Sequence, residues 1–234
     1  MIMKIFNNQI KIIILVASSF MLIIYLCALK KNKKKIKKEI YSLVNQFDGD
    51  VSVYVKHLKL NFEFGINEER LMPTASLIKI PILIKIFDRI EKNELSLDSV
   101  VTYYKDSIDY KWKGEDAISR FKDGEKITVK KLLTHMITLS DNHASLWLQK
   151  IAGGGIAINN WLSINNFKNT RVNSRTKGRE NNKKKYGWGE TTAKEMSDLL
   201  IKIREGKILT KPYSEKIYRH LTRIYWDEEA LSQI

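Results

Sequence analysis

The spacing of apolar residues along the chain predicts a largely helical protein with one early β-hairpin. Apolar side chains alternate with polar ones at residues 51–55 and 61–64, which predicts two strands that pair as a hairpin. No clear period is visible at residues 91–123 and 165–186, so we expect irregular connections there, the second being a long surface loop. Helical spacing, with an apolar residue every three or four positions, occurs in six segments: 36–47, 77–87, 129–137, 144–151, 192–204 and 212–224.

The N-terminal part of the chain carries an almost unbroken apolar run from Ile12 to Leu29. The run is long enough for an uncleaved membrane anchor or for the core of an export signal, and it lacks a clear small-x-small cleavage site, which favours the anchor. We therefore divide the chain into an anchor or signal segment at 1–30, a lysine-rich juxtamembrane tract at 31–38 and one domain at 39–234.

The charge around this segment leaves its orientation open. Seven lysines lie between Lys30 and Lys38, and the positive-inside rule would keep the following domain in the cytoplasm. The lysine content of the whole chain weakens that argument, since positive charge is not confined to this tract. We predict a membrane-anchored or exported protein, in the periplasm or at the cell surface, with membrane contact through the N-terminal segment.

Composition sets further limits on the class of protein. The chain has 234 residues, of which 44% are hydrophobic, and this is enough for one substantial core. The net charge of +15 comes mainly from lysines spread through the sequence, which is typical of a solvated surface, and we predict no nucleic-acid partner. The single cysteine, Cys27, excludes an intrachain disulfide, and four scattered histidines without paired cysteines predict no metal site and no cofactor.

A Ser-x-x-Lys pair at Ser76 and Lys79 is the first candidate for chemistry. On one helical turn this spacing places an amine beside a hydroxyl, so that the amine can take the proton of a nucleophilic serine. A helix start also offers backbone amides that can stabilise an oxyanion. The same spacing recurs at Ser119 and Ser174, and a serine that caps a helix beside a surface lysine gives the same pattern, so both interpretations stay open.

A Ser-Asp-Asn tripeptide at residues 140–142 is the second candidate. It falls on a short connection between two predicted helices, where side chains can point into a cleft instead of the core.

These motifs and the residues around them resemble the class A β-lactamases and the related penicillin-recognising acyl-serine enzymes. The resemblance implies an α+β fold of the β-lactamase/transpeptidase type, in which an antiparallel sheet is flanked by helices and joined to a helical subdomain. It extends over about residues 47–224 and rests on these matching segments: Thr74–Pro81, Ile127–Val129, Leu132–Leu133, Met136–Ile137, Ser140–Asn142, Thr191–Thr192, Met196 and Leu200.

The resemblance assigns a role to each motif residue. Ser76 would be the nucleophile and Lys79 its proton acceptor or electrostatic activator. Ser140 would pass a proton to the leaving nitrogen, Asn142 would bind the amide side chain of the substrate, and Asp141 would fix the connection. The implied activity is a β-lactamase-like serine hydrolase that opens a β-lactam amide through an acyl-enzyme at Ser76.

Two departures from the family pattern limit this prediction. The family places a deacylating glutamate in the loop before Thr191, and Glu180 is the nearest acid here, in a basic run that equally fits a plain surface glutamate. No Lys-Thr/Ser-Gly motif follows Thr192, so we expect a truncated or incompletely read domain that lacks the C-terminal strands of the sheet.

The sequence therefore leaves three functions open. One is hydrolysis of β-lactams, the second is a peptidase, transpeptidase or other serine hydrolase directed at a peptidoglycan-derived D-alanyl peptide, and the third is a catalytically inactive binding homologue.

Overall fold

The computed structural model describes residues 34–60, 62–105 and 121–223. The apolar run predicted as an anchor at 12–29 lies outside these ranges, as does Ser119 of the second Ser-x-x-Lys pair. Among the residues that the structure describes, no helix combines the length and the apolar character that crossing a membrane requires.

The chain divides into two units, the smaller formed by residues 1–51 and 55–66 and the larger by 52–54 and 67–234. The described part of the smaller unit contains a helix at residues 34–46 and most of a hairpin formed by β1 (Val53–His57) and β2 (Phe62–Ile66). The predicted helix at 36–47 and the predicted hairpin are thus confirmed.

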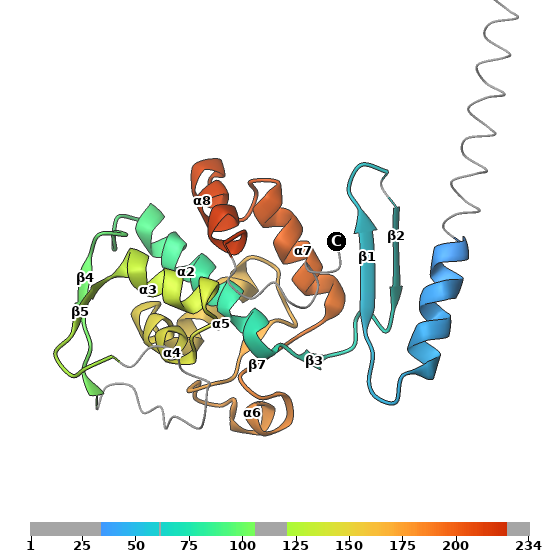
Figure 1. Ribbon diagram of the computed structural model, residues 1–234, viewed down its shortest axis with the longest axis horizontal. Coiled ribbons are helices and arrows are strands. Elements are labelled where there is room, and N and C mark those ends of the chain that lie inside the picture. The colour runs from blue at the N-terminus through green and yellow to red at the C-terminus, as the bar shows by residue number, and fades with distance from the viewer. Residues whose placement is uncertain (1–33, 61, 106–120, 224–234) are drawn as a thin grey trace, which may run out of the picture. The chain divides into compact units, whose positions relative to one another are not determined.

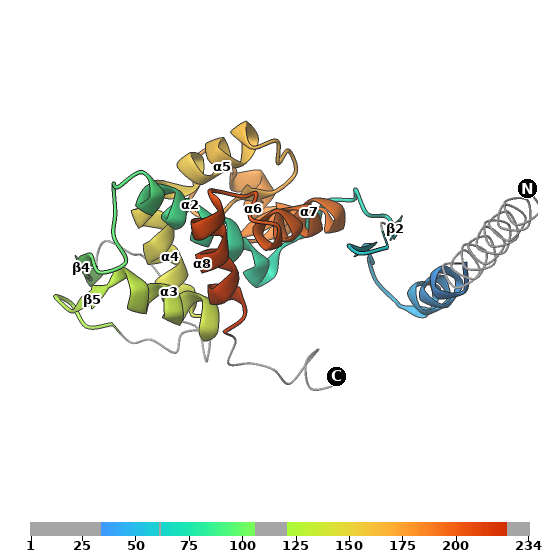
Figure 2. The same ribbon diagram turned by 90° about the horizontal axis from the view of Figure 1, so that it is seen from above.

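The larger unit is built around one helix, α2 (Lys79–Glu91), which is preceded by the 3₁₀ turn η1 (Ala75–Ile78). Figures 1 and 2 show α2 surrounded by other helices, and it contacts each of four: α3 (Val129–Thr138), α4 (Asn142–Ile151), α5 (Gly154–Ile164) and α8 (Lys211–Leu221). The helices predicted from spacing are confirmed, including α7 (Ala193–Arg204), whose N-cap Thr192 accepts a hydrogen bond from Glu195 N at 3.1 Å.

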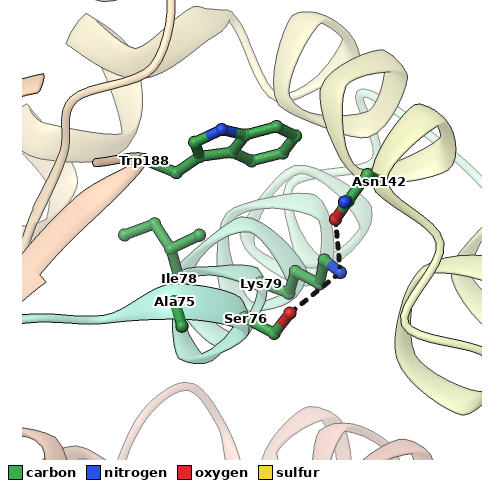
Figure 3. A pocket seen from close by; sticks show the side chains of 6 residues that line it. All are labelled: Ala75, Ser76, Ile78, Lys79, Asn142 and Trp188. Carbon is green, nitrogen blue, oxygen red and sulfur yellow. Dashed lines mark hydrogen bonds between the residues drawn. The ribbon is translucent and has the colours of Figure 1, made fainter. Parts of the chain in front are cut away.

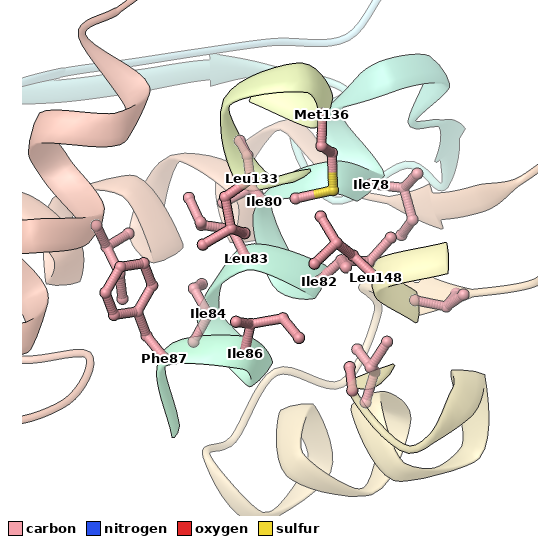
Figure 4. Packing of buried hydrophobic residues seen from close by; sticks show 14 of the residues in the cluster. Ile78, Ile80, Ile82, Leu83, Ile84, Ile86, Phe87, Leu133, Met136 and Leu148 are labelled. Atoms are coloured by element: carbon pink, nitrogen blue, oxygen red, sulfur yellow. The ribbon is translucent and has the colours of Figure 1, made fainter. Parts of the chain in front are cut away.

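The core of this unit lies along α2 because that helix is apolar on nearly every side. Figure 4 shows its side chains packed against Leu133 and Met136 from α3 and Leu148 from α4, all of which are fully buried. The buried residues of α2 itself are no more than 1% exposed through the middle of the helix: Ile82, Leu83, Ile84, Ile86 and Phe87.

The sheets of the larger unit are small and antiparallel. One has the order β3-β7-β6, formed by β3 (Met72–Pro73), β7 (Gly189–Thr191) and β6 (Arg171–Val172), with Met72 opposite Thr191 and Arg171 opposite Glu190. The other pairs β4 (Val100–Thr102) with β5 (Lys126–Thr128). The expectation that residues 91–123 are only irregular was therefore wrong for β4, whose three residues are too few to show a period.

The expectation of a long surface loop at 165–186 was also wrong. This segment contains β6 and the helix α6 (Glu180–Tyr186), and several of its polar side chains are buried. Gln149 Nε2 donates to Ser174 O at 2.6 Å, and Ser174 Oγ donates to Gln149 Oε1 at 3.0 Å, so α4 holds the segment against the helices. The polar composition that suggests a solvated loop instead serves an internal hydrogen-bond network.

Candidate active site

Ser76 lies in η1, directly after β3, and its side chain is exposed. Thr74 N donates to Gly189 O at 3.0 Å, which ties the start of η1 to β7. A Cβ at Gly189 would lie 2.4 Å from Ile78 Cδ1, so a larger residue here would force the side chains of Ile78 and Thr74 to move. The residue before the serine, Ala75, has φ = +44°, a left-handed conformation that is uncommon for a residue with a side chain.

Lys79 begins α2 one turn after Ser76, and it is only 3% exposed. Its Nζ donates to Ser76 Oγ at 3.2 Å, to Ser140 Oγ at 2.9 Å and to Asn142 Oδ1 at 3.0 Å, and also to Ser140 O. One ammonium group therefore joins Ser76 of the first motif to Ser140 and Asn142 of the second.

The Ser-Asp-Asn tripeptide connects α3 to α4 as the sequence predicted. Asp141 is 1% exposed and caps α4, because its Oδ1 accepts from Ala144 N at 2.6 Å. Ser140 has φ = +55°, and this turn directs its hydroxyl to Ser76, where Ser140 Oγ donates to Ser76 Oγ at 3.1 Å. The tripeptide, whose Asn142 is the first residue of α4, thus supplies one structural cap and two polar side chains directed at the same lysine.

The surroundings of Lys79 lower its pKa from 10.5 to about 8. Burial is the main cause, because removing the ammonium from water disfavours its charged form, and the carboxylate of Asp141 opposes this effect by raising the pKa. Near neutral pH a measurable fraction of this amine is unprotonated and able to accept the proton of a neighbouring hydroxyl.

Ser76, Lys79 and Asn142 line a cavity of about 220 Å³ together with Ala75, Ile78 and Trp188. Figure 3 shows the indole of Trp188 across the cavity from the Ser76 hydroxyl. Sequence reasoning missed Trp188 as a site residue. The available signal was its place between Gly187 and Gly189, immediately before the Thr191–Thr192 segment.

Glu180 does not line this cavity. It is exposed at the start of α6, and its Oε1 accepts from Gly178 N at 3.1 Å. Glu190, the other acid of this region, is 4% exposed and engaged by Arg179, Asn173 and Asn182, with Asn182 Nδ2 at 2.9 Å from its Oε2. Neither carboxylate is among the lining residues of the cavity in the described part of the chain.

The structure also distinguishes the repeated Ser-x-x-Lys pairs that it describes. Ser174 is 4% exposed and bound to Gln149, whereas Lys177 is exposed, so this pair does not form the arrangement seen at Ser76 and Lys79.

Comparison with known proteins adds a family and a set of similar folds. The profile described as "Beta-lactamase enzyme family" matches residues 34–234. The chain is 23% identical over 217 residues to β-lactamase VEB-1 from Pseudomonas aeruginosa, a match that covers 92% of this chain and 70% of that protein.

Two solved structures illustrate the similarity in fold. The structure of PBP-A is 21% identical, with a TM-score of 0.70, and the match covers 82% of this chain and 70% of that one. An ancestral class A β-lactamase of Gram-negative bacteria is 20% identical, with a TM-score of 0.69, over 84% of this chain and 74% of that one. The mixed fold of helices and small antiparallel sheets is therefore of the β-lactamase/transpeptidase type.

Proposed function

The chain belongs to the β-lactamase enzyme family, and from this premise we propose that Ser76 forms an acyl-enzyme with β-lactams. The observation that carries the proposal is the set of hydrogen bonds from Lys79 Nζ to Ser76, Ser140 and Asn142. An exposed hydroxyl beside a buried lysine of lowered pKa provides a nucleophile with an adjacent base, which is one way to activate a serine.

Acylation begins with proton transfer from Ser76 to Lys79. Unprotonated Lys79 Nζ accepts the proton of Ser76 Oγ, and the oxygen attacks the carbonyl carbon of the lactam. The backbone amide of Ser76, at the start of the helical segment, is one donor to the oxyanion.

The tetrahedral intermediate then collapses with cleavage of the carbon–nitrogen bond of the ring. The lactam nitrogen takes a proton from Ser140 Oγ, which is replaced by a proton from Lys79 Nζ at 2.9 Å. The products are a Ser76 ester with the opened ring still attached and an unprotonated lysine. Asn142 binds the amide side chain of the substrate.

Hydrolysis of this ester completes a β-lactamase reaction, and its rate separates two candidate functions. Glu180 is poorly placed to activate water, because it is exposed and bound to the backbone of its own turn. This observation favours a second candidate, a D-alanyl peptide-directed enzyme that β-lactams acylate for a long time. A similar solved structure, a point variant of PBP-A, is described as an acyl-enzyme complex with penicillin G.

The experiment is incubation of the intact chain with a fluorescent penicillin, followed by separation of labelled protein from released product. We expect covalent label in the wild type and none in Ser76→Ala. The matched controls Ser174→Ala and Ser119→Ala, which change the other two Ser-x-x-Lys pairs, retain the label.

The time course then assigns the function. Rapid release of opened drug supports the hydrolase, and a persistent adduct at Ser76 supports the peptide-directed enzyme. Label that survives in Ser76→Ala and disappears in Ser174→Ala contradicts the proposal.

The location proposed for the domain follows from its substrates. β-Lactams and peptidoglycan peptides are met outside the cytoplasm, so we place the domain there, with the apolar run at 12–29 as its anchor or export signal. Digestion of the domain by protease added to spheroplasts, in which the outer layers of the envelope are open and the cytoplasmic membrane is intact, tests this, and complete protection would contradict it.

A further inference from the structure

We propose that Trp188 is a specificity-determining residue of the Ser76 cavity, selecting β-lactams with an aromatic acyl side chain. The inference rests on the proposed function and adds to it the class of side chain that the cavity prefers. Its basis is the position of the indole, the rigidity of the backbone that carries it and the chemistry of the other lining groups.

The indole provides the only aromatic surface among the described residues that line the cavity. Figure 3 shows it on the side opposite Ser76 and Lys79, with Asn142 at one end. A ligand whose carbonyl carbon reaches Ser76 Oγ and whose amide meets Asn142 must therefore extend its side chain along the indole.

The backbone at Trp188 is held on both sides. Trp188 O accepts from Asn173 N at 2.8 Å and from Ser174 N at 3.0 Å. Gly187 has φ = +70° and ends α6, and Gly189 fits closely against Ile78. These constraints hold the backbone that carries the indole, so little conformational entropy is lost when a ligand packs on it.

A buried polar network reinforces this attachment. Glu190 accepts hydrogen bonds from Asn173 on one side and from Asn182 of α6 on the other, and it is paired with Arg179. The segment before Trp188 is thereby fixed to a carboxylate of the segment that follows it. Trp188 therefore lies in a segment that is fixed by hydrogen bonds.

The chemistry of the Trp188 indole determines which ligand side chain it binds best. An indole face gives large apolar contact and also pairs favourably with another ring in offset or edge-to-face geometry. The apolar lining residues Ala75 and Ile78 are uncharged. Lys79, the charged side chain among the described lining residues, is engaged by Ser76, Ser140 and Asn142. A β-lactam with an aromatic side chain therefore packs on the indole better than one that carries a hydrogen atom or a short polar group at that position.

The experiment compares two β-lactams that share a ring system and differ in the side chain. Benzylpenicillin carries an aromatic acyl group, and aminopenicillanic acid carries none. The measured quantity is the ratio of their second-order rate constants for acylation of the intact chain. We expect this ratio to fall roughly three- to tenfold in Trp188→Ala and to recover most of its value in Trp188→Phe.

Tyr186→Ala is the matched control, because it removes a partly buried aromatic side chain two positions away that does not line the cavity. It should leave the ratio at the wild-type value. An unchanged ratio in Trp188→Ala, or an equal loss with both drugs, overturns the proposal because Trp188 would then act only on the fold.

The two proposals fail in different ways. If neither drug acylates the wild type, the proposed function is wrong and the assignment of Trp188 is wrong with it. If both drugs acylate the wild type at Ser76 but the ratio does not depend on residue 188, only the assignment of Trp188 is wrong.

Discussion

The two ends of the helical segment formed by η1 and α2 are built in opposite ways. At the far end Phe87 is fully buried among apolar side chains, with its ring centroid 5.5 Å from that of His220. At the near end Ala75 has a left-handed backbone, and a lysine is buried at position 79. The far end is therefore built mainly from packed apolar side chains, with the buried Asp88 paired to Lys85 and Lys92. The near end combines an unfavourable backbone conformation with a buried ammonium.

This contrast separates what holds the fold from what serves the chemistry. Burial of an amine and a left-handed alanine each oppose folding. They persist because the adjoining turns of the same helix supply a large apolar interface. The apolar core, one or two turns away, thus offsets the free-energy cost of these two features.

The largest effect is expected at the core end. Phe87→Ala should lower the free energy of unfolding by about 3–5 kcal/mol, because it removes apolar contact and leaves a cavity beside α8. Urea denaturation measures the change. Leu77→Ala, which truncates a side chain 47% exposed on the same segment, is the control and should change stability by less than about 1 kcal/mol. Equal losses of unfolding free energy in the two variants would contradict the difference between the two ends of this segment.

An effect of intermediate size is expected from the buried amine. The pKa of Lys79 is about 8 in the fold, below its ordinary 10.5, so the unfolded chain binds more protons between these values and stability rises with pH across that window. Between about pH 7 and pH 10 this single group should add about 2–3 kcal/mol to the free energy of unfolding.

Lys79→Met isolates that contribution from those of the other lysines. The variant should lack this part of the pH dependence, which denaturation at both pH values would reveal as a difference between the two proteins. Parallel curves for wild type and variant would mean that Lys79 titrates normally.

The smallest effect concerns the backbone before the nucleophile. Ala75→Gly should raise the free energy of unfolding by about 0.5–1 kcal/mol, since glycine adopts φ > 0 without the strain that alanine has there. The same change at Ala157, inside α5, should instead lower it by about 0.5–1 kcal/mol. A loss of stability at position 75 would show that its backbone is not strained.

The sequence alone was sufficient to place the motif residues on the correct elements. Apolar spacing predicted α2, α3, α4, α7 and α8, and the residues around Ser76 and Ser140 predicted that the two motifs act together. Local rules were sufficient because helix periodicity and capping depend on neighbours in the chain.

The region around Trp188 could not be predicted in the same way. Its order depends on contacts between residues distant in sequence, such as Gln149 with Ser174, and polar side chains that satisfy one another look like a solvated loop in the sequence. The short strands β4 and β6 also have too few residues to show alternation. The exposure of Glu180 likewise depends on where α6 lies, and spacing alone does not determine this.

The pH dependence of acylation at Ser76 tests the role of Lys79 most directly. The second-order rate constant for labelling by benzylpenicillin reports the pKa of the essential base in the free enzyme. With Lys79 as that base, the rate should rise about tenfold per pH unit below the pKa and level off above about pH 8. A rate constant that is flat across this range, or one that falls as the lysine loses its proton, would contradict the assignment of Lys79 as the group that activates Ser76.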